Sequence, residues 1–104
     1  MAQLIGKWKL EKAAGHDITK PTEVLFSEEG RLSWRYGNNF FGQFTIDGQN
    51  IKIGPLASTL MFLPQDPPEH IVSKAFEDST SWAIAGNTLT LSHESEVKVV
   101  LTKV

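Results

Sequence analysis

The residues that could do chemistry in this chain are three histidines, a Ser-His-Glu triplet and several carboxylates. Ser92, His93 and Glu94 are the residue types of nucleophilic catalysis. However, three consecutive residues at a turn cannot adopt the geometry in which a histidine bridges a nucleophile and an acid. The serine is also not part of a strand-turn-helix nucleophile elbow. We therefore expect a solvated turn here and a protein that is not an enzyme.

The histidines do not form a metal-binding pattern. His16, His70 and His93 fall in separate expected turns or loops, and none of them has a partner at the spacing of a ligand pair. The chain contains no cysteine, which excludes thiolate metal sites, thiol nucleophiles and disulfides. The carboxylates at 28–29 and at 94–96 lie in expected turns exposed to water, where tuned acid–base chemistry is improbable. The sequence thus predicts no catalytic residue, no metal and no cofactor.

The composition is that of an ordinary soluble domain. A chain of 104 residues suits one domain spanning 1–104, and 40% apolar residues are enough for a real core. The formal net charge of −2 offers no long-range attraction for a phosphate backbone, so nucleic acid is not an expected partner. No apolar run approaches the roughly 20 residues that span a bilayer, and Lys7 and Lys9 interrupt the start before a signal-peptide core forms. We expect a monomeric, cytoplasmic protein.

Alternation of apolar and polar residues dominates the chain, and turn residues interrupt it about every ten positions, which is the pattern of antiparallel strands. Strands are expected at 7–11, 22–26, 31–36, 40–46, 50–54 and in three further segments within 81–104, which turns at 86–87 and 93–95 separate. The alternation places these side chains inward: Trp8, Leu10, Leu32, Trp34, Tyr36, Ile51, Ile53, Trp82, Ile84, Leu89, Leu91, Val97, Val99 and Leu101. The three tryptophans are accordingly expected in the core.

Two segments differ from this pattern. The apolar run at 55–64 fits either a buried strand or a short helix, and we favour a strand. Apolar residues at helical spacing behind Pro68 predict one short helix at about 69–77. The expected fold is therefore mainly β: a small, antiparallel, barrel-like meander with one short α-helix before the C-terminal hairpins, closed or nearly closed because closure removes exposed edges.

The segments "LIGKWKL", "GNNFFGQFTIDGQNIKIGPLASTLMF" and "WAIAGNTLTL" resemble, in order and spacing, the META domain, also called the HslJ-like heat-shock domain. The resemblance covers nearly the whole chain. The family's pattern reads roughly Gly-Cys-Asn-x-aromatic-x-Gly-x-aromatic and later Thr-x-Met-x-Cys. The residues that stand at family positions, and that the resemblance implies are structural, are Trp8, Asn38, Phe40, Gly42, Phe44, Thr59 and Met61.

The chain departs from that pattern at both cysteines. Tyr36 and Gly37 replace the Gly-Cys pair, and Leu63 replaces the second cysteine. Their joint absence is natural if bacterial members pair them in an oxidising compartment and this chain lives in a reducing one. Cysteine-free members look most like the META proteins of trypanosomatid parasites, which are linked to virulence and secretory traffic. The family brings no established catalytic residues.

The outward-facing residues of the central strands are the remaining candidates for a site. Arg31 and Arg35 lie on one outward face, where they could bind an anion together with Lys7 or Lys9, although a solvated face is the favoured interpretation. Asn38 is expected to adopt a left-handed turn conformation between the strands that flank it.

The stretch "RYGNNFFGQFT" reads as a hairpin with Phe40 and Phe44 inward and Phe41 outward beside Gln43. Together with residues of the following apolar run, Leu60 and Phe62, these outward side chains form a candidate partner surface of the kind that marks interaction sites. The function expected first is a noncatalytic module that binds an unknown protein partner, linked by the resemblance to stress response, virulence or secretory traffic.

A small apolar-ligand carrier is the alternative, because "GKW" resembles the Gly-x-Trp opening of lipocalins and fatty-acid-binding proteins. This chain is shorter than those barrels, however. Its aromatic residues are expected to fill an interior that is only just wide enough for side chains or one small ligand.

Overall fold

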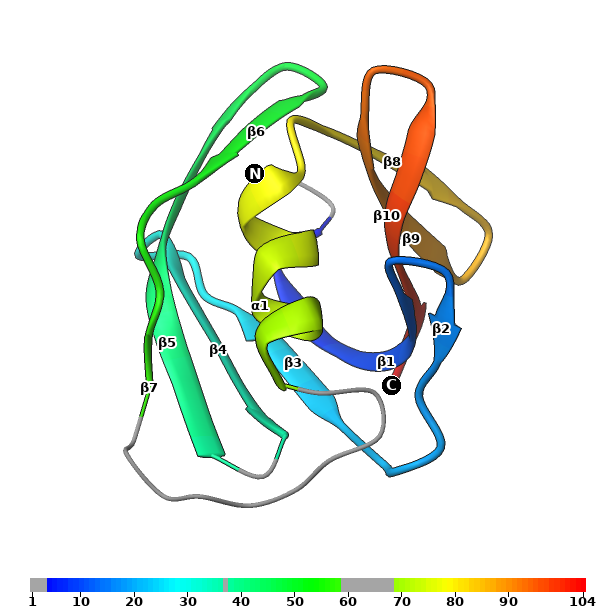
Figure 1. Ribbon diagram of the computed structural model, residues 1–104. Coiled ribbons are helices and arrows are strands. Elements are labelled where there is room, and N and C mark those ends of the chain that lie inside the picture. Colours follow the sequence, from blue (N-terminus) through cyan, green and yellow to red (C-terminus); the bar gives the residue numbers. More distant parts are fainter. Residues whose placement is uncertain (1–3, 37, 59–68) are drawn as a thin grey trace.

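The computed structural model shows a mainly β protein with one helix (Figure 1), and it describes residues 4–36, 38–58 and 69–104. The predicted fold class is confirmed. The strands of the described chain are β1 (Gly6–Ala13), β2 (His16–Asp17), β3 (Glu23–Phe26), β4 (Arg31–Tyr36), β5 (Asn38–Asp47), β6 (Asn50–Ile53), β7 (Ala57–Ser58), β8 (Ser81–Ala85), β9 (Thr88–His93) and β10 (Glu96–Lys103), and the helix is α1 (Glu69–Asp78).

All strand pairs are antiparallel, and the sheet has the order β10-β9-β8-β6-β5-β4-β3-β1-β2, with β7 paired to β5. Strand β10 also pairs with β1, so the sheet curves into a ring of strands. Between β6 and β8 the described residues pair at one point, Asn50 with Ser81. This is the weakest join of the ring, since the neighbouring joins extend over several residue pairs.

The helix lies within the ring and completes the core (Figure 1). Its bounds agree with the helix predicted at 69–77. Val72, Ala75 and Phe76 are buried, as their spacing along one helix face requires. Ser79 ends the helix by donating a hydrogen bond from its hydroxyl to the carbonyl oxygen of Ala75 at 2.8 Å.

Aromatic side chains pack the helix against the sheet. The indole of Trp34 stacks on Phe40, with ring centres 5.1 Å apart, and on Phe76 of α1 at 4.2 Å. Phe26 meets the ring of Phe44 edge to face at 5.2 Å. These contacts have geometries that stabilise aromatic pairs beyond the burial of area, so the central hairpin and α1 form one packed unit.

The register of the β4–β5 hairpin is the one predicted. Trp34 pairs with Phe40 and Ser33 pairs with Phe41. Phe40 and Phe44 are buried, whereas 51% of Phe41 is exposed. Since neighbouring residues on a strand point to opposite faces, Phe41 belongs to the outer face of the sheet.

One inward assignment is wrong, and two are met in part. Val97 is 50% exposed, because the register between β9 and β10 shifts by one residue between Val97 and Val99 and turns the preceding side chain outward. Trp82 and Ile84 are only half-buried but pack against the core, and Nε1 of Trp82 donates to the carbonyl oxygen of Gly48 at 3.0 Å.

One segment differs from the expected pattern, and another lies only partly within the described residues. The expected loop before residue 20 contains the two-residue strand β2. Of the apolar run at 55–64, β7 is a strand as favoured, and residues 59–64 lie outside the described residues.

Candidate functional site

A row of directly paired residues crosses the outer face of the sheet at the level of Phe41. Phe41 on β5 pairs with Ser33 on β4, Ser33 with Leu25 on β3, and Leu25 with Lys7 on β1, while Ala57 of β7 pairs with Phe41 on the other side. Directly paired residues of a sheet lie side by side on the same face. Leu25, which is 38% exposed, and Phe41 therefore lie on the same solvent-exposed face, with the small side chain of Ser33 between them.

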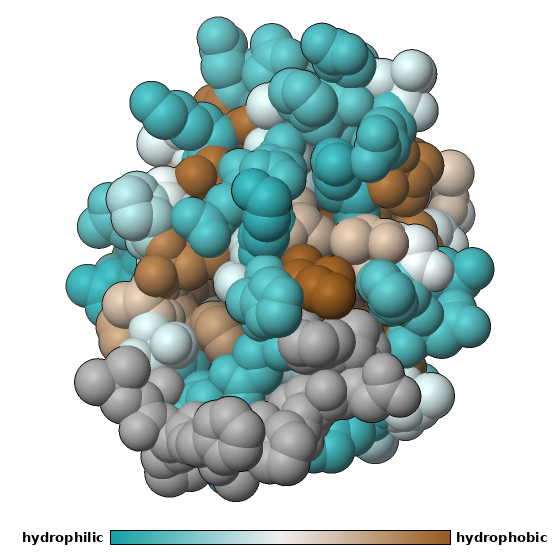
Figure 2. Space-filling view, in the orientation of Figure 1, coloured by the Kyte–Doolittle hydropathy of each residue, from teal (hydrophilic) through white to brown (hydrophobic). Residues whose placement is uncertain are grey.

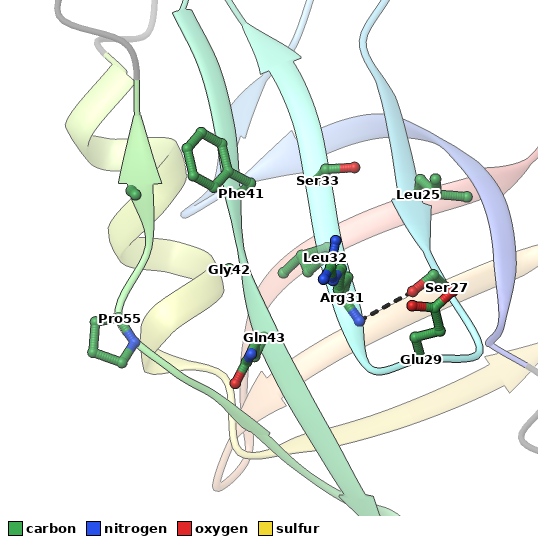
Figure 3. Close-up of a pocket in the computed structure, with 11 residues that line it drawn as sticks. Leu25, Ser27, Glu29, Arg31, Leu32, Ser33, Phe41, Gly42, Gln43 and Pro55 are labelled. Carbon is green, nitrogen blue, oxygen red and sulfur yellow. Dashed lines mark hydrogen bonds between the residues drawn. The ribbon is translucent and has the colours of Figure 1, made fainter.

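This row forms the floor and walls of an open groove of about 600 Å³. In Figure 3, Phe41 and Pro55 lie on one side of it and Leu25 and Glu29 on the other, with Arg31 between them. We call it the outer-face groove, and its lining residues are Leu25, Ser27, Glu29, Arg31, Leu32, Ser33, Phe41, Gly42, Gln43, Pro55 and Ala57. Figure 2, in the orientation of Figure 1, shows brown and tan side chains among teal ones on the side that carries β5 and β7.

Gly42 allows the segment before β7 to form one wall of the outer-face groove. A Cβ atom added to Gly42 would lie 2.6 Å from Cδ2 of Leu56 and 3.2 Å from the carbonyl oxygen of Pro55. Leu56 is half-buried and packs against the core in the space that a side chain would need. The glycine at this family position is thus explained by the close approach of a neighbouring segment.

Gly42→Ala is expected to lower the free energy of unfolding by about 1–2 kcal/mol, because the methyl group overpacks the contact with Leu56 and Pro55. Denaturant unfolding measures the change. Gly54→Ala is the matched control, since an added Cβ there meets its nearest atom at an ordinary 3.6 Å. If the two variants were equally stable, close approach would not be the reason for the glycine.

The cations of the outer face differ in whether they are paired. Lys7 forms an ion pair with Glu23 at 3.7 Å, whereas the exposed Arg31 and Arg35 make no ion pair with a described residue. Strand β3 separates the two lysines of β1 from the arginines of β4. The structure therefore does not gather the arginines and lysines into the single anion site considered from the sequence.

The structure brings together half of the partner surface proposed from the sequence. Phe41 and Gln43 both line the outer-face groove, while Leu60 and Phe62 lie outside the described residues. Leu25 was missed. An outward leucine in an alternating strand is the sequence feature that points to Leu25. Its significance becomes clear only in the sheet, where β4 lies between β3 and β5 and brings Leu25 and Phe41 to the same face.

Asn38 has a role that sequence reasoning assigned wrongly. It is not in a left-handed turn, since the described non-glycine residues with positive φ are Ala14 and Glu94. Instead it begins β5, is 4% exposed, and donates from Nδ2 to both carboxylate oxygens of Glu69, at 2.7 and 3.0 Å. This contact ties the first turn of α1 to the sheet.

The remaining described family positions lie in the core. Trp8 is buried and its Nε1 donates to the carbonyl oxygen of Leu4 at 2.8 Å, and Phe40 and Phe44 belong to the same hydrophobic cluster. Thr59 and Met61 lie outside the described residues.

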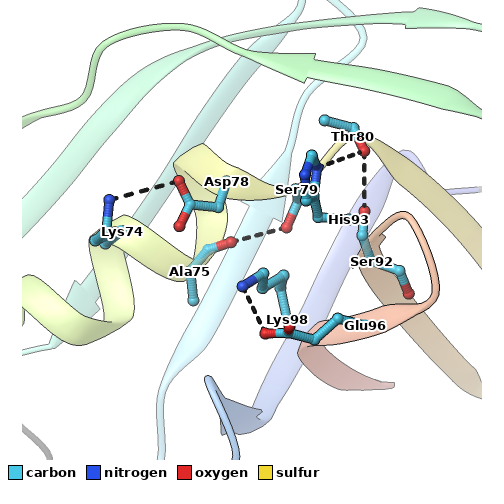
Figure 4. A network of polar contacts seen from close by, with 9 residues as sticks. All are labelled: Lys74, Ala75, Asp78, Ser79, Thr80, Ser92, His93, Glu96 and Lys98. Atoms are coloured by element: carbon cyan, nitrogen blue, oxygen red, sulfur yellow. Dashed lines mark hydrogen bonds and ion pairs between the residues drawn. The ribbon is translucent and has the colours of Figure 1, made fainter.

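The Ser-His-Glu triplet does not assemble a triad. Nδ1 of His93 lies 3.2 Å from the hydroxyl of Thr80 (Figure 4), and the carbonyl oxygen of Ser92 accepts a hydrogen bond from the hydroxyl of Ser81 at 3.2 Å. Glu94 is exposed at the turn with a positive φ. Across the described parts of the chain, no three His, Asp or Glu side chains converge as metal ligands would.

An ion pair beside this turn sets the pKa values of its two members. Nζ of Lys98 lies 2.7 Å from Oε1 of Glu96, and this hydrogen bond lowers the pKa of Glu96 and raises the pKa of Lys98. The lowered carboxyl pKa contributes stability above the pKa of the unfolded chain, and this contribution is lost as pH falls through the folded value.

Lys98→Met is therefore expected to raise the pKa of Glu96 toward its ordinary value, as followed by NMR titration of the carboxyl carbon. Lys98→Arg, which keeps a cation, is the control and should preserve most of the shift. A Glu96 titration curve that Lys98→Met leaves unchanged would show that the pair is absent in solution.

Comparisons with known proteins agree with this fold. The chain matches the META domain over residues 2–104. No curated protein matches it. Among the described residues, no helix has the length and apolar character needed to cross a membrane.

Several solved structures share the architecture. An NMR structure of a Burkholderia xenovorans protein is 19% identical with a TM-score of 0.71, covering 98% of this chain and 85% of that one. A crystal structure of a DUF4847 family protein from Bacteroides vulgatus is 13% identical with a TM-score of 0.68, covering 93% and 91%. A further NMR structure is 19% identical with a TM-score of 0.71, covering 93% and 87%. At these identities the likeness concerns the fold alone, whereas the family match extends over nearly every residue. This chain belongs to the META domain family.

Proposed function

We propose that this domain is a noncatalytic protein-interaction module whose docking surface is the outer-face groove. The observation that carries the proposal is the exposure of Leu25 and Phe41 in one groove, on either side of Ser33. A lone exposed apolar residue needs no explanation, but neighbouring ones in a concavity are typical of partner surfaces. The family suggests that the module acts in stress response, virulence or secretory traffic.

The energetics favour Phe41 as the centre of such a contact. Complete burial of an exposed Phe side chain contributes roughly 1.5–3 kcal/mol, and about half of Phe41 remains to be buried. Aromatic side chains are common anchors of interfaces because a large apolar area is immobilised at low entropic cost. Gly42 allows the segment that contains Pro55 to approach β5 closely and to form the wall beside Phe41.

The apolar-ligand carrier is disfavoured by the packing of the interior. Trp34 fills the space between Phe40 and Phe76, and the described core is continuous from β1 to α1. Rings stacked at these distances are packed as in an ordinary protein interior, which argues against an acyl chain at this place in the core. Titration with a fluorescent fatty acid should therefore give no saturable, stoichiometric binding, and tight uptake would restore the carrier.

Affinity purification from the native cell, followed by mass spectrometry, tests the proposal. The bait is compared with Phe41→Ser, which should lose its specific partners while remaining folded. Val97→Ser is the matched control, because Val97 is equally exposed at 50% but lies on β10, away from the groove. Partners that survive Phe41→Ser, or that are lost equally in Val97→Ser, would place the binding surface elsewhere.

A further inference from the structure

We propose, resting on the function above, that the outer-face groove binds an extended segment of a partner protein in which an apolar residue lies between two acidic residues, each two positions away. Arg31, Ser33 and Arg35 are the successive outward positions of β4. The strand therefore presents a cation, a small residue and a cation in a line, and the apolar pair Leu25 and Phe41 flanks the small residue.

The spacing of these positions selects an extended partner. Residues two apart on a strand are separated by about 6.6 Å, and an extended peptide repeats its own side chains on one face at the same interval. An apolar side chain seated over Ser33, between Leu25 and Phe41, would place residues two before and two after it opposite Arg31 and Arg35. Small Ser33 leaves the room for the anchor.

The positive charges of Arg31 and Arg35 favour acidic residues at the two flanking positions of the bound segment. Neither Arg31 nor Arg35 pairs with a carboxylate among the described residues, although both are exposed. Glu23, the acidic residue of β3 on this face, is engaged by Lys7 at 3.7 Å. Glu29 lines the far wall of the groove without an ion pair to Arg31 in the described chain. Carboxylates of a partner would complete bidentate contacts with the guanidinium groups.

NMR titration of the isotope-labelled protein with three synthetic nine-residue peptides tests the inference. The peptides share a central Thr-Phe-Thr and differ only in the residues two positions before and two positions after the Phe. These two residues are both Glu, both Gln or both Lys. The Glu peptide is expected to shift amide signals of β3, β4 and β5 around the groove and to bind about tenfold more tightly than the Gln peptide. The Lys peptide should bind most weakly.

Charge reversal provides the decisive variant. Arg31→Glu combined with Arg35→Glu changes only exposed side chains, so the fold should persist, and the order of affinity should reverse in favour of the Lys peptide. Lys52→Glu is the control, because Lys52 is an exposed cation on β6, outside the residues that line the groove. It should leave the order of affinity unchanged.

The outcomes separate the inference from the proposed function. Equal binding of the Glu and Gln peptides, abolished by Phe41→Ser, would overturn the acidic preference and leave the docking surface standing. If none of the peptides shifts the groove amides, the segment chemistry is wrong. In that case the affinity purification with Phe41→Ser still decides the proposed function independently.

Discussion

Replacing Phe44 with serine is expected to lower the free energy of unfolding by about 4 kcal/mol. Phe44 is 5% exposed and packs edge to face against Phe26 with ring centres 5.2 Å apart. The substitution removes an aromatic ring from a closely packed region and leaves a hydroxyl in the remaining cavity. Denaturant unfolding measures the loss as a lower midpoint of the transition.

Phe41→Ser is the matched control, made on the same strand and with the same chemical change. Because half of the Phe41 side chain is already in water, this variant should lose only about 1 kcal/mol of the free energy of unfolding. The comparison tests the register of the β4–β5 hairpin, since a slip by one residue exchanges the faces of all side chains on β5. A silent Phe44→Ser together with an unfolded Phe41→Ser would refute both the register and the docking surface.

Asn38→Leu is expected to lower the free energy of unfolding by about 3 kcal/mol. The buried amide of Asn38 donates to both oxygens of Glu69, and leucine leaves that half-buried carboxylate without its donor. The hydrogen bond joins the first residue of β5 to the first turn of α1, so its loss should also weaken the packing of the helix against the sheet. Thermal and denaturant unfolding, followed by circular dichroism, measure the effect.

A double-mutant cycle isolates this contact. Glu69→Leu removes the other partner, and the combination of Asn38→Leu with Glu69→Leu should cost less than the sum of the two single changes. Glu77→Gln is the control, because Glu77 is an exposed carboxylate on the same helix. Strict additivity of the two leucine substitutions would mean that the amide and the carboxylate do not interact in solution.

Much of the fold could be predicted because the relevant signals are local. Alternation along a strand reports which side chains face inward, and it placed Phe40 and Phe44 in the core and Phe41 outside it. Helical spacing and a preceding proline located α1 within a residue of its observed end. The same local rule failed at Val97, because a one-residue shift in pairing with β9 reverses the faces and leaves no mark in the alternation itself.

The candidate site was predictable only in part. Phe41 and Gln43 were recognised as outward, and both line the outer-face groove. Leu25 was not, since its significance depends on its place two strands away from Phe41 with Ser33 between them. Pairing between strands joins residues that are far apart in the sequence, and no single-strand pattern records which of them become neighbours.

The sequence by itself determined the class of the fold, its family and the inner and outer faces of most strands, because burial acts on each strand through its own alternation. The tertiary structure alone decided three matters: that Asn38 bonds to Glu69, that Leu56 occupies the space left by Gly42, and that strand pairing sets the row of Leu25, Ser33 and Phe41 between Arg31 and Arg35 of β4, which make no ion pair with a described residue. Each depends on the approach of segments separated by many residues, and that approach is set by the closing of the sheet and the docking of the helix.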